Sequence, residues 1–180
     1  MRVIAGTYRG RRLAAPSGSR TRPTSDRVRE ALFSILGACV DGARVLVLFA
    51  GSGALGIEAL SRGAASATFV DQDEQAVRVV RQNLEALGLA ERGRAVRADA
   101  VRWLGTNAET VKRASLVLLD PPYNDAVLEH ALVLLDSLVA EGATVVAERS
   151  HRQGLPDLRR LQAGRERRYG DTAVSVLVAG

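Results

Sequence analysis

The stretch of sequence that decides the fold is RVLVLFAGSGALG, at residues 44–56. Its first six residues form an apolar, branched run of the kind that fills a strand buried on both faces of a sheet. Gly51 and Gly53 follow directly. Because glycine has no Cβ, they allow a sharp turn and a close approach of a ligand to the backbone. We therefore predict a strand, a glycine loop, and a helix from about Leu55 to Ser61 whose positive end points at the loop.

Further strands and helices alternate along the chain. Helical spacing of apolar residues predicts helices over 73–87 and 125–139. Short apolar runs predict strands at 67–70, 94–98, 116–119, 143–147 and 173–178, the last with a partner strand near 165–169. This alternation predicts a single α/β domain with a Rossmann-like, mostly parallel, seven-stranded sheet and helices on both faces. Such a sheet binds its ligand beyond the carboxyl ends of its strands.

Acidic residues follow three of the first four predicted strands. Asp71 lies 18 residues after Gly53, where a carboxylate can accept hydrogen bonds from both hydroxyls of a ribose. NAD-dependent enzymes and methyltransferases share that feature. Asp99, followed by Ala100, can accept a bond from an adenine amino group or can cap a helix over 100–104, and the sequence leaves both possibilities open. The third acid is Asp120, and we expect all three beside the glycine loop.

Asp120 begins the tetrapeptide Asp120-Pro121-Pro122-Tyr123, which is the most specific chemical signal in the chain. The two prolines remove two N–H donors, so the carbonyls of Asp120 and Pro121 are free to point into the cleft. An exocyclic amine on a base is a poor nucleophile, because its lone pair is delocalised into the ring. Two acceptors around its hydrogens favour a nucleophilic geometry, and Tyr123 can stack on the extruded base. The motif therefore predicts methylation of a base amine by positioning and electrostatic stabilisation.

Basic residues are concentrated at the start of the chain. The formal net charge is +5, and residues 1–30 hold eight arginines against two acidic residues. Arginine binds phosphate with a planar fork, so we predict a basic arm for nucleic acid over residues 1–23, followed by a catalytic domain over 24–180. A solvated basic terminus explains the charge equally well. Within the arm, 2–5 and 11–14 are predicted to pair as a short hairpin. After the arm, Thr24 or Ser25 is predicted to cap a helix.

Several functional classes are excluded by composition. Cys39 is the only cysteine, so an intramolecular disulfide and a cysteine-based zinc site are both impossible, and His130 and His151 cannot rebuild a zinc site. We therefore expect no bound metal. No apolar run approaches the roughly 20 residues of a membrane helix, and the first residues do not resemble a signal peptide. The expectation is a cytoplasmic protein with no membrane partner.

Taken together, these motifs resemble a known family. Their order resembles class I S-adenosylmethionine-dependent methyltransferases that act on amino groups, and more closely the bacterial 16S rRNA guanine-N2 methyltransferases. The resemblance covers nearly the whole chain. The matching stretches are RVIAGTYRGRRL, TRPTSDRVREALFSIL, LFAGSGALGIEALSRGA, FVDQDEQAV, LLDPPYN and ERRYGDTAVSVL.

The resemblance implies a cofactor site for S-adenosyl-L-methionine. Gly51 and Gly53 would pass close to its methionine moiety, and Asp71 would hold the ribose. Asp99 and Ala100 would hold the adenine. Thr24, in the segment Arg22-Pro23-Thr24, would close over the site.

The resemblance also implies a substrate. Asp120, Pro121, Pro122 and Tyr123 would orient the N2 amine of a guanine in 16S rRNA, presented within the 30S subunit or an assembly intermediate to a monomeric enzyme. The arginines that we expect to contact rRNA phosphates are Arg2, Arg9, Arg11, Arg12, Arg22 and Arg27.

One residue departs from the family pattern. The family usually has an acidic residue two positions before the aromatic residue of the glycine loop, and this chain has Val47 there. That carboxylate commonly helps to hold the cofactor's ammonium group, so we expect the affinity for S-adenosylmethionine to fall about tenfold to a hundredfold.

Three other functions fit parts of the pattern. A DNA adenine-N6 methyltransferase would use the same loop, although no inserted domain for reading a duplex is present. A non-catalytic RNA-binding or assembly factor is suggested by Val47 and the basic N-terminus. A nicotinamide-dependent dehydrogenase would give the Asp-Pro-Pro-Tyr loop no role.

Overall fold

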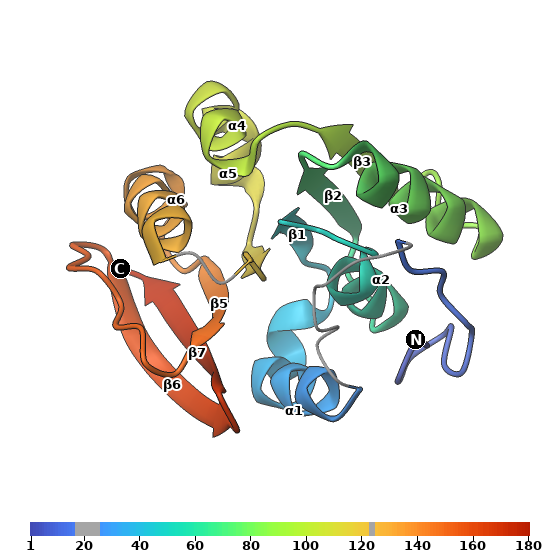
Figure 1. Cartoon of the computed structure of the whole chain (residues 1–180), viewed down its shortest axis with the longest axis horizontal. Coiled ribbons are helices and arrows are strands. Elements are labelled where there is room, and N and C mark those ends of the chain that lie inside the picture. Colours follow the sequence, from blue (N-terminus) through green and yellow to red (C-terminus); the bar gives the residue numbers. More distant parts are fainter. Residues whose placement is uncertain (17–25, 123–124) are drawn as a thin grey trace.

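A seven-stranded sheet forms the centre of the α/β fold, as the sequence predicted (Figure 1). The computed structural model describes residues 1–16, 26–122 and 125–180. The strand order is β3-β2-β1-β4-β5-β7-β6. The first five strands are parallel, and β7 is antiparallel to both β5 and β6. The strands are β1 (Arg44–Leu48), β2 (Ser66–Asp71), β3 (Gly93–Arg97), β4 (Leu116–Leu119), β5 (Thr144–Ser150), β6 (Leu161–Tyr169) and β7 (Thr172–Ala179).

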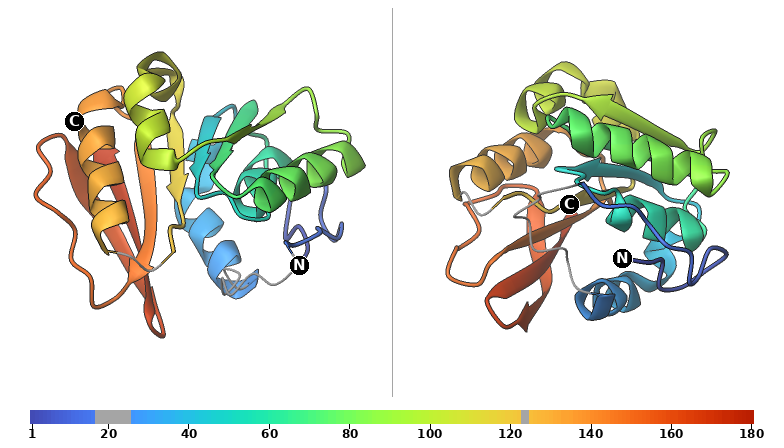
Figure 2. Two further views of the ribbon diagram at one scale, coloured as in Figure 1. Left: turned by 45° about the horizontal axis from the view of Figure 1, so that its top comes forward. Right: turned by 45° about the vertical axis from the view of Figure 1, so that its right-hand side comes forward.

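Helices cover both faces of this sheet (Figure 2). One hydrophobic core lies between the sheet and the helices α1 to α3, and a second core lies between the sheet and α4 to α6. The helices are α1 (Asp26–Leu36), α2 (Ala54–Ser61), α3 (Glu74–Ala86), α4 (Ala100–Thr106), α5 (Ala108–Arg113) and α6 (Asp125–Leu138), with a short 3-10 helix η1 (Gly37–Val40). Burial on both faces explains why the central strands have almost no polar residues.

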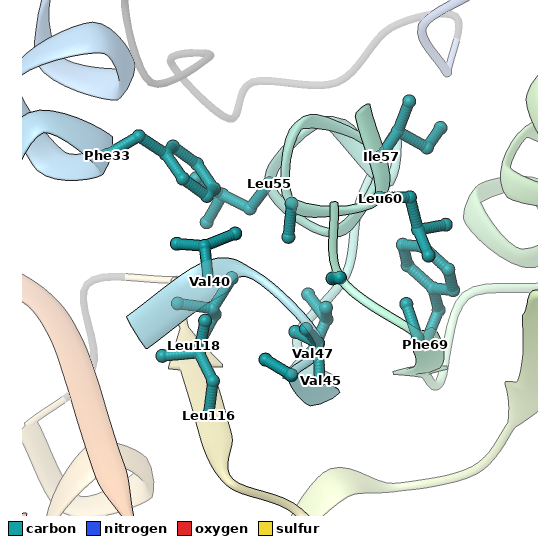
Figure 3. Close-up of a cluster of buried hydrophobic side chains, with 14 of the residues drawn as sticks. Phe33, Val40, Val45, Val47, Leu55, Ile57, Leu60, Phe69, Leu116 and Leu118 are labelled. Atoms are coloured by element: carbon teal, nitrogen blue, oxygen red, sulfur yellow. The ribbon is translucent and has the colours of Figure 1, made fainter. Parts of the chain in front are cut away.

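The alternation of side chains in β1 shows how the two cores divide the sheet. Val45 and Val47 point into the core below α2, whereas Leu46 and Leu48 point into the core below α4 and α6. In Figure 3, the two valines lie beside Leu118 of β4 and opposite Leu55 of α2. These four residues are each under 5% exposed, so β1 is fixed in register from both sides.

Two parts of the fold differ from the sequence prediction. Helix α5 was not predicted, because its six residues bury only Val111 and carry no apolar periodicity. Strand β6 begins four residues earlier than expected, at Leu161. Its residues 162–168 are all exposed at the edge of the sheet, so no apolar alternation marks them in the sequence.

Asp136 connects α6 to the beginning of β6. Its carboxylate accepts hydrogen bonds from the backbone N–H groups of Arg159 (2.9 Å), Arg160 (2.8 Å) and Leu161 (2.7 Å). Burial raises the pKa of this carboxyl, but the three donors lower it more, so its pKa lies below the ordinary value of 3.8. The charged carboxylate therefore stabilises the fold fully above pH 3.8, and the stabilisation is lost as pH falls through the lowered pKa.

Asp136→Asn is expected to lower the free energy of unfolding by about 3 kcal/mol near neutral pH, because an amide cannot accept from all three donors. Denaturant unfolding of both proteins at several pH values measures this. The difference should shrink as pH falls below about 4, because the carboxyl of the unfolded chain takes up a proton there before the carboxyl of the folded protein does. Glu129→Gln, an exposed change in the same helix, is the control. A loss under about 1 kcal/mol, or a difference that grows as pH falls, would contradict this account of Asp136.

Candidate functional site

The glycine loop and the Asp120 loop lie side by side at the carboxyl edge of the sheet. Leu48, the last residue of β1, is paired with Leu119, the last residue of β4. On its other side, Leu48 is paired with Val70 of β2. The chain runs from β1 towards β3 on one side and from β4 towards β5 on the other, so β1 and β4 form the topological switch point where open α/β sheets bind ligands (Figure 1).

The backbone of the glycine loop has left-handed conformations at three positions. Gly51 has a φ of 55° and Gly53 a φ of 79°, which explains why both are glycines. Phe49 has a φ of 59°, an unusual value for a bulky side chain, and it is held there by packing against the core below α4 and α6. A Cβ on Gly51 would meet no atom within 4 Å. The loop therefore exposes its backbone to open space at the edge of the sheet.

Asp71 binds the glycine loop directly. Its Oδ2 accepts a hydrogen bond from the N–H of Gly51 (2.8 Å), and its Oδ1 accepts one from the N–H of Asp73 (2.9 Å). Each carboxylate oxygen has a further lone pair, so the half-buried side chain retains capacity for ligand hydroxyls. Contact with a ribose stays a prediction, but Asp71 lies beside the loop as expected.

Asp99 is the cap of α4. Its Oδ1 accepts a hydrogen bond from the N–H of Arg102 (2.9 Å), which confirms the capping alternative. The side chain is exposed, whereas Ala100 is buried at the beginning of the helix. The adenine contact assigned to both residues stays a prediction.

The Asp120 loop leaves β4 at the switch point. Asp120 is half-buried, Pro121 is buried and Pro122 is exposed. Tyr123 lies outside the described residues, as do Arg22 and Thr24.

The N-terminal residues form the predicted hairpin. Arg2 and Arg12 make an antiparallel bridge, and the N–H of Val3 donates to the carbonyl of Arg11 (3.0 Å). Val3 and Leu13 are buried in the core below α1 and α2. In Figure 1 the hairpin lies against α2 and α3, on the side of the sheet that carries β1 and β2.

Buried polar side chains of α2 hold this hairpin in place. Glu58 accepts hydrogen bonds from the N–H groups of Ile4 (2.8 Å) and Ala5 (3.0 Å). Ser61 accepts from the N–H of Tyr8 (3.0 Å) and donates to the carbonyl of Ala5 (2.6 Å). Sequence reasoning missed both residues. The available signal was the polar character of two positions in a helix that is otherwise apolar on every side.

Asn83 of α3 joins the hairpin to the glycine loop. Its side-chain oxygen accepts from the N–H of Ala14 (2.8 Å), and its amide nitrogen donates to the carbonyls of Ala14 (3.0 Å) and Ser52 (3.0 Å). The side chain is 3% exposed, so no water replaces these bonds easily. Sequence reasoning missed Asn83 too. It is a polar residue among the apolar positions of an amphipathic helix.

Asn83→Ala is expected to weaken binding of S-adenosylhomocysteine about tenfold, because the carbonyl of Ser52 loses the donor that holds it. Isothermal titration calorimetry measures the affinity. Gln82→Ala, an exposed change on the same helix, should bind like the wild type. An unchanged affinity in the Asn83 variant would show that the loop keeps its shape without this link.

The predicted RNA-binding arginines fall into two groups. Arg2 pairs with Asp26 (3.4 Å), and Arg11 donates to the carbonyl of Ala86 (3.2 Å). Of this predicted set, Arg9, Arg12 and Arg27 are exposed, and their side chains make no hydrogen bond or ion pair with the residues that the structure describes.

Arg29 does not belong to the basic surface. Its side chain is 1% exposed, close to Glu58, and it donates to Asp26 (3.0 Å) and to the carbonyl of Arg2. Burial lowers the pKa of its guanidinium, and the charges of Glu58 and Asp26 oppose that shift. One of the eight N-terminal arginines therefore stabilises the interior.

Val47 is 1% exposed and points into the core near Leu55 and Phe69 (Figure 3). Gly56 packs against the same group, because a Cβ there would lie 2.3 Å from Phe69. An apolar side chain fits these surroundings. The expected loss of cofactor affinity stays a prediction.

Residues 1–16, 26–122 and 125–180 contain neither a membrane-spanning helix nor a cluster of metal ligands. No helix in those ranges is long and apolar enough to cross a bilayer. The same ranges contain no group of three or more histidine, cysteine, aspartate or glutamate side chains able to hold a metal ion.

The strand order, the antiparallel β7 and the paired loops at the switch point define a class I methyltransferase fold. The family model described as "Conserved hypothetical protein 95" matches residues 1–178. The chain therefore belongs to this family.

Individual proteins that this chain resembles are described as methyltransferases. A Bacillus subtilis relative described as "Putative rRNA methyltransferase YlbH" is 42% identical over 179 residues, covering 98% of this chain and 97% of its own length. The Escherichia coli K12 protein "Ribosomal RNA small subunit methyltransferase D" is 39% identical over 158 residues, covering 87% of this chain and 78% of its own. A solved Escherichia coli structure, "Putative methyltransferase yhhF", superposes with a TM-score of 0.88 at 35% identity and covers 99% and 97% of the two chains.

Proposed function

We propose that this chain transfers a methyl group from S-adenosylmethionine to the exocyclic N2 amine of a guanine in 16S rRNA of the small ribosomal subunit. The observation that carries the proposal is the pairing of Leu48 with Leu119, because it sets the glycine loop and the Asp120 loop side by side. A cofactor on one loop and a base on the other can then meet. The names of the relatives, which refer to rRNA and to the small subunit, support the choice of substrate.

The residues at the edge of the sheet fit the cofactor. The open space at Gly51 would admit the methionine moiety against the backbone, and the positive end of α2 would favour the carboxylate of that moiety. Asp71 has lone pairs for the ribose hydroxyls, and Asp99 retains a second oxygen for the adenine amine. Thr24 would close the site. When bound, S-adenosylmethionine supplies an electrophilic methyl group.

The Asp120 loop would prepare the nucleophile. The Asp120 carboxylate and the Pro121 carbonyl accept the two N–H groups of guanine N2, which directs the nitrogen lone pair towards the methyl carbon. Tyr123 would stack on the base. As the bond from N2 to the methyl carbon forms and the bond from that carbon to the cofactor's sulfur breaks, positive charge would develop on N2, and the Asp120 carboxylate would stabilise that charge and accept the departing proton. No covalent enzyme intermediate is required.

The substrate-binding element would be the basic N-terminal hairpin, and the remainder of the chain would be the catalytic domain. We expect a monomer that acts in the cytoplasm on the 30S subunit or an assembly intermediate. Arg9, Arg12 and Arg27 are free to contact phosphates, because their side chains make no bond within the described residues.

Methyl transfer from labelled cofactor tests the proposal. The purified protein is incubated with 30S subunits, deproteinised 16S rRNA or duplex DNA, and the products are digested to nucleosides and identified. Label in N2-methylguanine from either ribosomal substrate is expected. Label in N6-methyladenine from DNA alone, or no transfer to any substrate, would overturn the proposal.

A further inference from the structure

The C-terminal part of the chain contains a second cluster of basic residues. Residues 149–168 hold seven arginines against two acidic residues. Acidic residues elsewhere balance these arginines, so the net charge of the chain after residue 30 does not reveal the cluster. Its structural setting separates arginines that stabilise the fold from arginines that face solvent.

Three of the seven arginines, Arg149, Arg160 and Arg168, have side chains that bind other residues, and Arg168 donates to the carbonyl of Gly170 (2.9 Å). Arg149 is buried and forms an ion pair with Glu166 of β6, and the hydroxyl of Ser175 donates to the same carboxylate. Arg160 donates to the carbonyl of Val139 (3.0 Å). By contrast, Arg165 and Arg167 are exposed on β6, and within the described residues their side chains make no hydrogen bond or ion pair.

Arg165 and Arg167 point to the face of the sheet that carries α1. Directly paired residues of antiparallel strands lie on the same face, and Arg165 is paired with Val176, Arg167 with Val174. Both valines pack into the core below α1 and α2. The N-terminal hairpin buries Val3 in that same core, so both basic regions belong to one face of the molecule.

Arg167 also lies at the level of the Asp120 loop. Because β7 is antiparallel to both of its neighbours, β6 runs in the same direction as β5 and β4. Arg167 is paired with Val174, which is paired with Glu148, one residue beyond the partner of Leu119. Three inter-strand spacings separate β4 from β6, or about 14 Å.

Asp120 therefore lies between two sets of unpaired arginines. The hairpin lies on the β1 side of β4, and β6 lies on the opposite side (Figure 1). We propose that Arg165 and Arg167 form a second contact with the RNA backbone, so that the strand carrying the target base is held on both sides of the Asp120 loop. This inference rests on the proposed RNA substrate and adds a binding surface to it. Exposed arginine forks suit phosphate oxygens.

The competing explanation is protection of the sheet edge. Charged residues on an edge strand prevent pairing with another sheet, and β6 is an edge strand. In that case, removal of the two arginines would lead to self-association and would leave RNA binding unchanged.

The test is the double variant Arg165→Ala/Arg167→Ala, assayed for binding to fluorescently labelled 16S rRNA at several salt concentrations. We expect affinity at physiological salt to fall about tenfold, and the slope of log K against log[salt] to decrease by about 1.4, for two lost phosphate contacts on a single strand. Affinity for S-adenosylhomocysteine should stay within about twofold of the wild type. Lysine at both positions should restore most of the binding.

Arg44→Ala/Arg113→Ala is the matched control. It removes the same charge from two exposed positions, the first residue of β1 and the last residue of α5, near the amino edge of the sheet and away from Asp120. Two results would overturn the inference and leave the proposed function intact. One is an Arg165→Ala/Arg167→Ala variant that stays monomeric and keeps the wild-type RNA affinity and salt dependence. The other is an equal loss of RNA affinity in the control variant. A wild-type protein that binds neither 16S rRNA nor 30S subunits would reject both the inference and the proposed function. Self-association with unchanged RNA binding would favour edge protection.

Discussion

Asp120→Ala is expected to lower kcat by about 100- to 1000-fold, because the variant loses the acceptor that orients the amine and the charge that stabilises the developing cation. The affinity for S-adenosylhomocysteine should stay within about twofold, since the cofactor contacts are assigned to the neighbouring strands. Single-turnover methylation of 30S subunits and calorimetry measure the two quantities separately.

The conservative variant Asp120→Asn separates the contribution of the hydrogen-bond acceptor to the rate from that of the negative charge. Asparagine keeps one acceptor oxygen but lacks the charge, so its rate should lie between those of the wild type and the alanine variant. Asp157→Ala removes an exposed carboxylate elsewhere and serves as the control. Equal losses of turnover and cofactor binding in Asp120→Ala would contradict the role assigned to this residue.

Glu58→Ala is expected to lower the free energy of unfolding by about 3–5 kcal/mol. Glu58 is fully buried, contacts Arg62 (2.8 Å), lies 3.9 Å from Arg29, and binds the backbone of the hairpin. Removing it leaves the buried Arg29 without its closest fully buried counter-charge and leaves backbone N–H groups unpaired. Denaturant unfolding measures the loss.

The same variant should release the hairpin before the domain unfolds. Limited trypsin digestion is then expected to cleave after Arg9, Arg11 or Arg12 faster than in the wild type, because the contacts to Ile4 and Ala5 are gone. Glu85→Ala, an exposed change on α3, is the control. A loss in the free energy of unfolding under about 1 kcal/mol would show that Arg29 and the hairpin do not need Glu58 as a partner.

The central part of the fold could be predicted from the sequence because its signals are local. Buried parallel strands require continuous apolar runs, and the turn at Gly51 and Gly53 requires residues that adopt positive φ. The strand ends then locate Asp71 and Asp120 at one edge, without knowledge of any long-range contact.

The remaining features depend on contacts between distant segments. Strand β6 is exposed along most of its length, and Glu166 is fixed by Arg149 rather than by an apolar neighbour. Glu58 and Asn83 bind backbone groups of residues more than 50 positions away in the sequence. Charge counting also treats a buried arginine and an exposed one as equal, so the count of eight N-terminal arginines includes the buried Arg29.

A crystal structure with bound S-adenosylhomocysteine tests the central claim most directly. The account predicts that the cofactor lies against the backbone at Gly51, with its sulfur directed towards the carboxylate of Asp120 and its ribose hydroxyls on Asp71. A cofactor that binds away from the glycine loop, or one whose sulfur is separated from Asp120 by packed side chains, would contradict methyl transfer at this edge of the sheet.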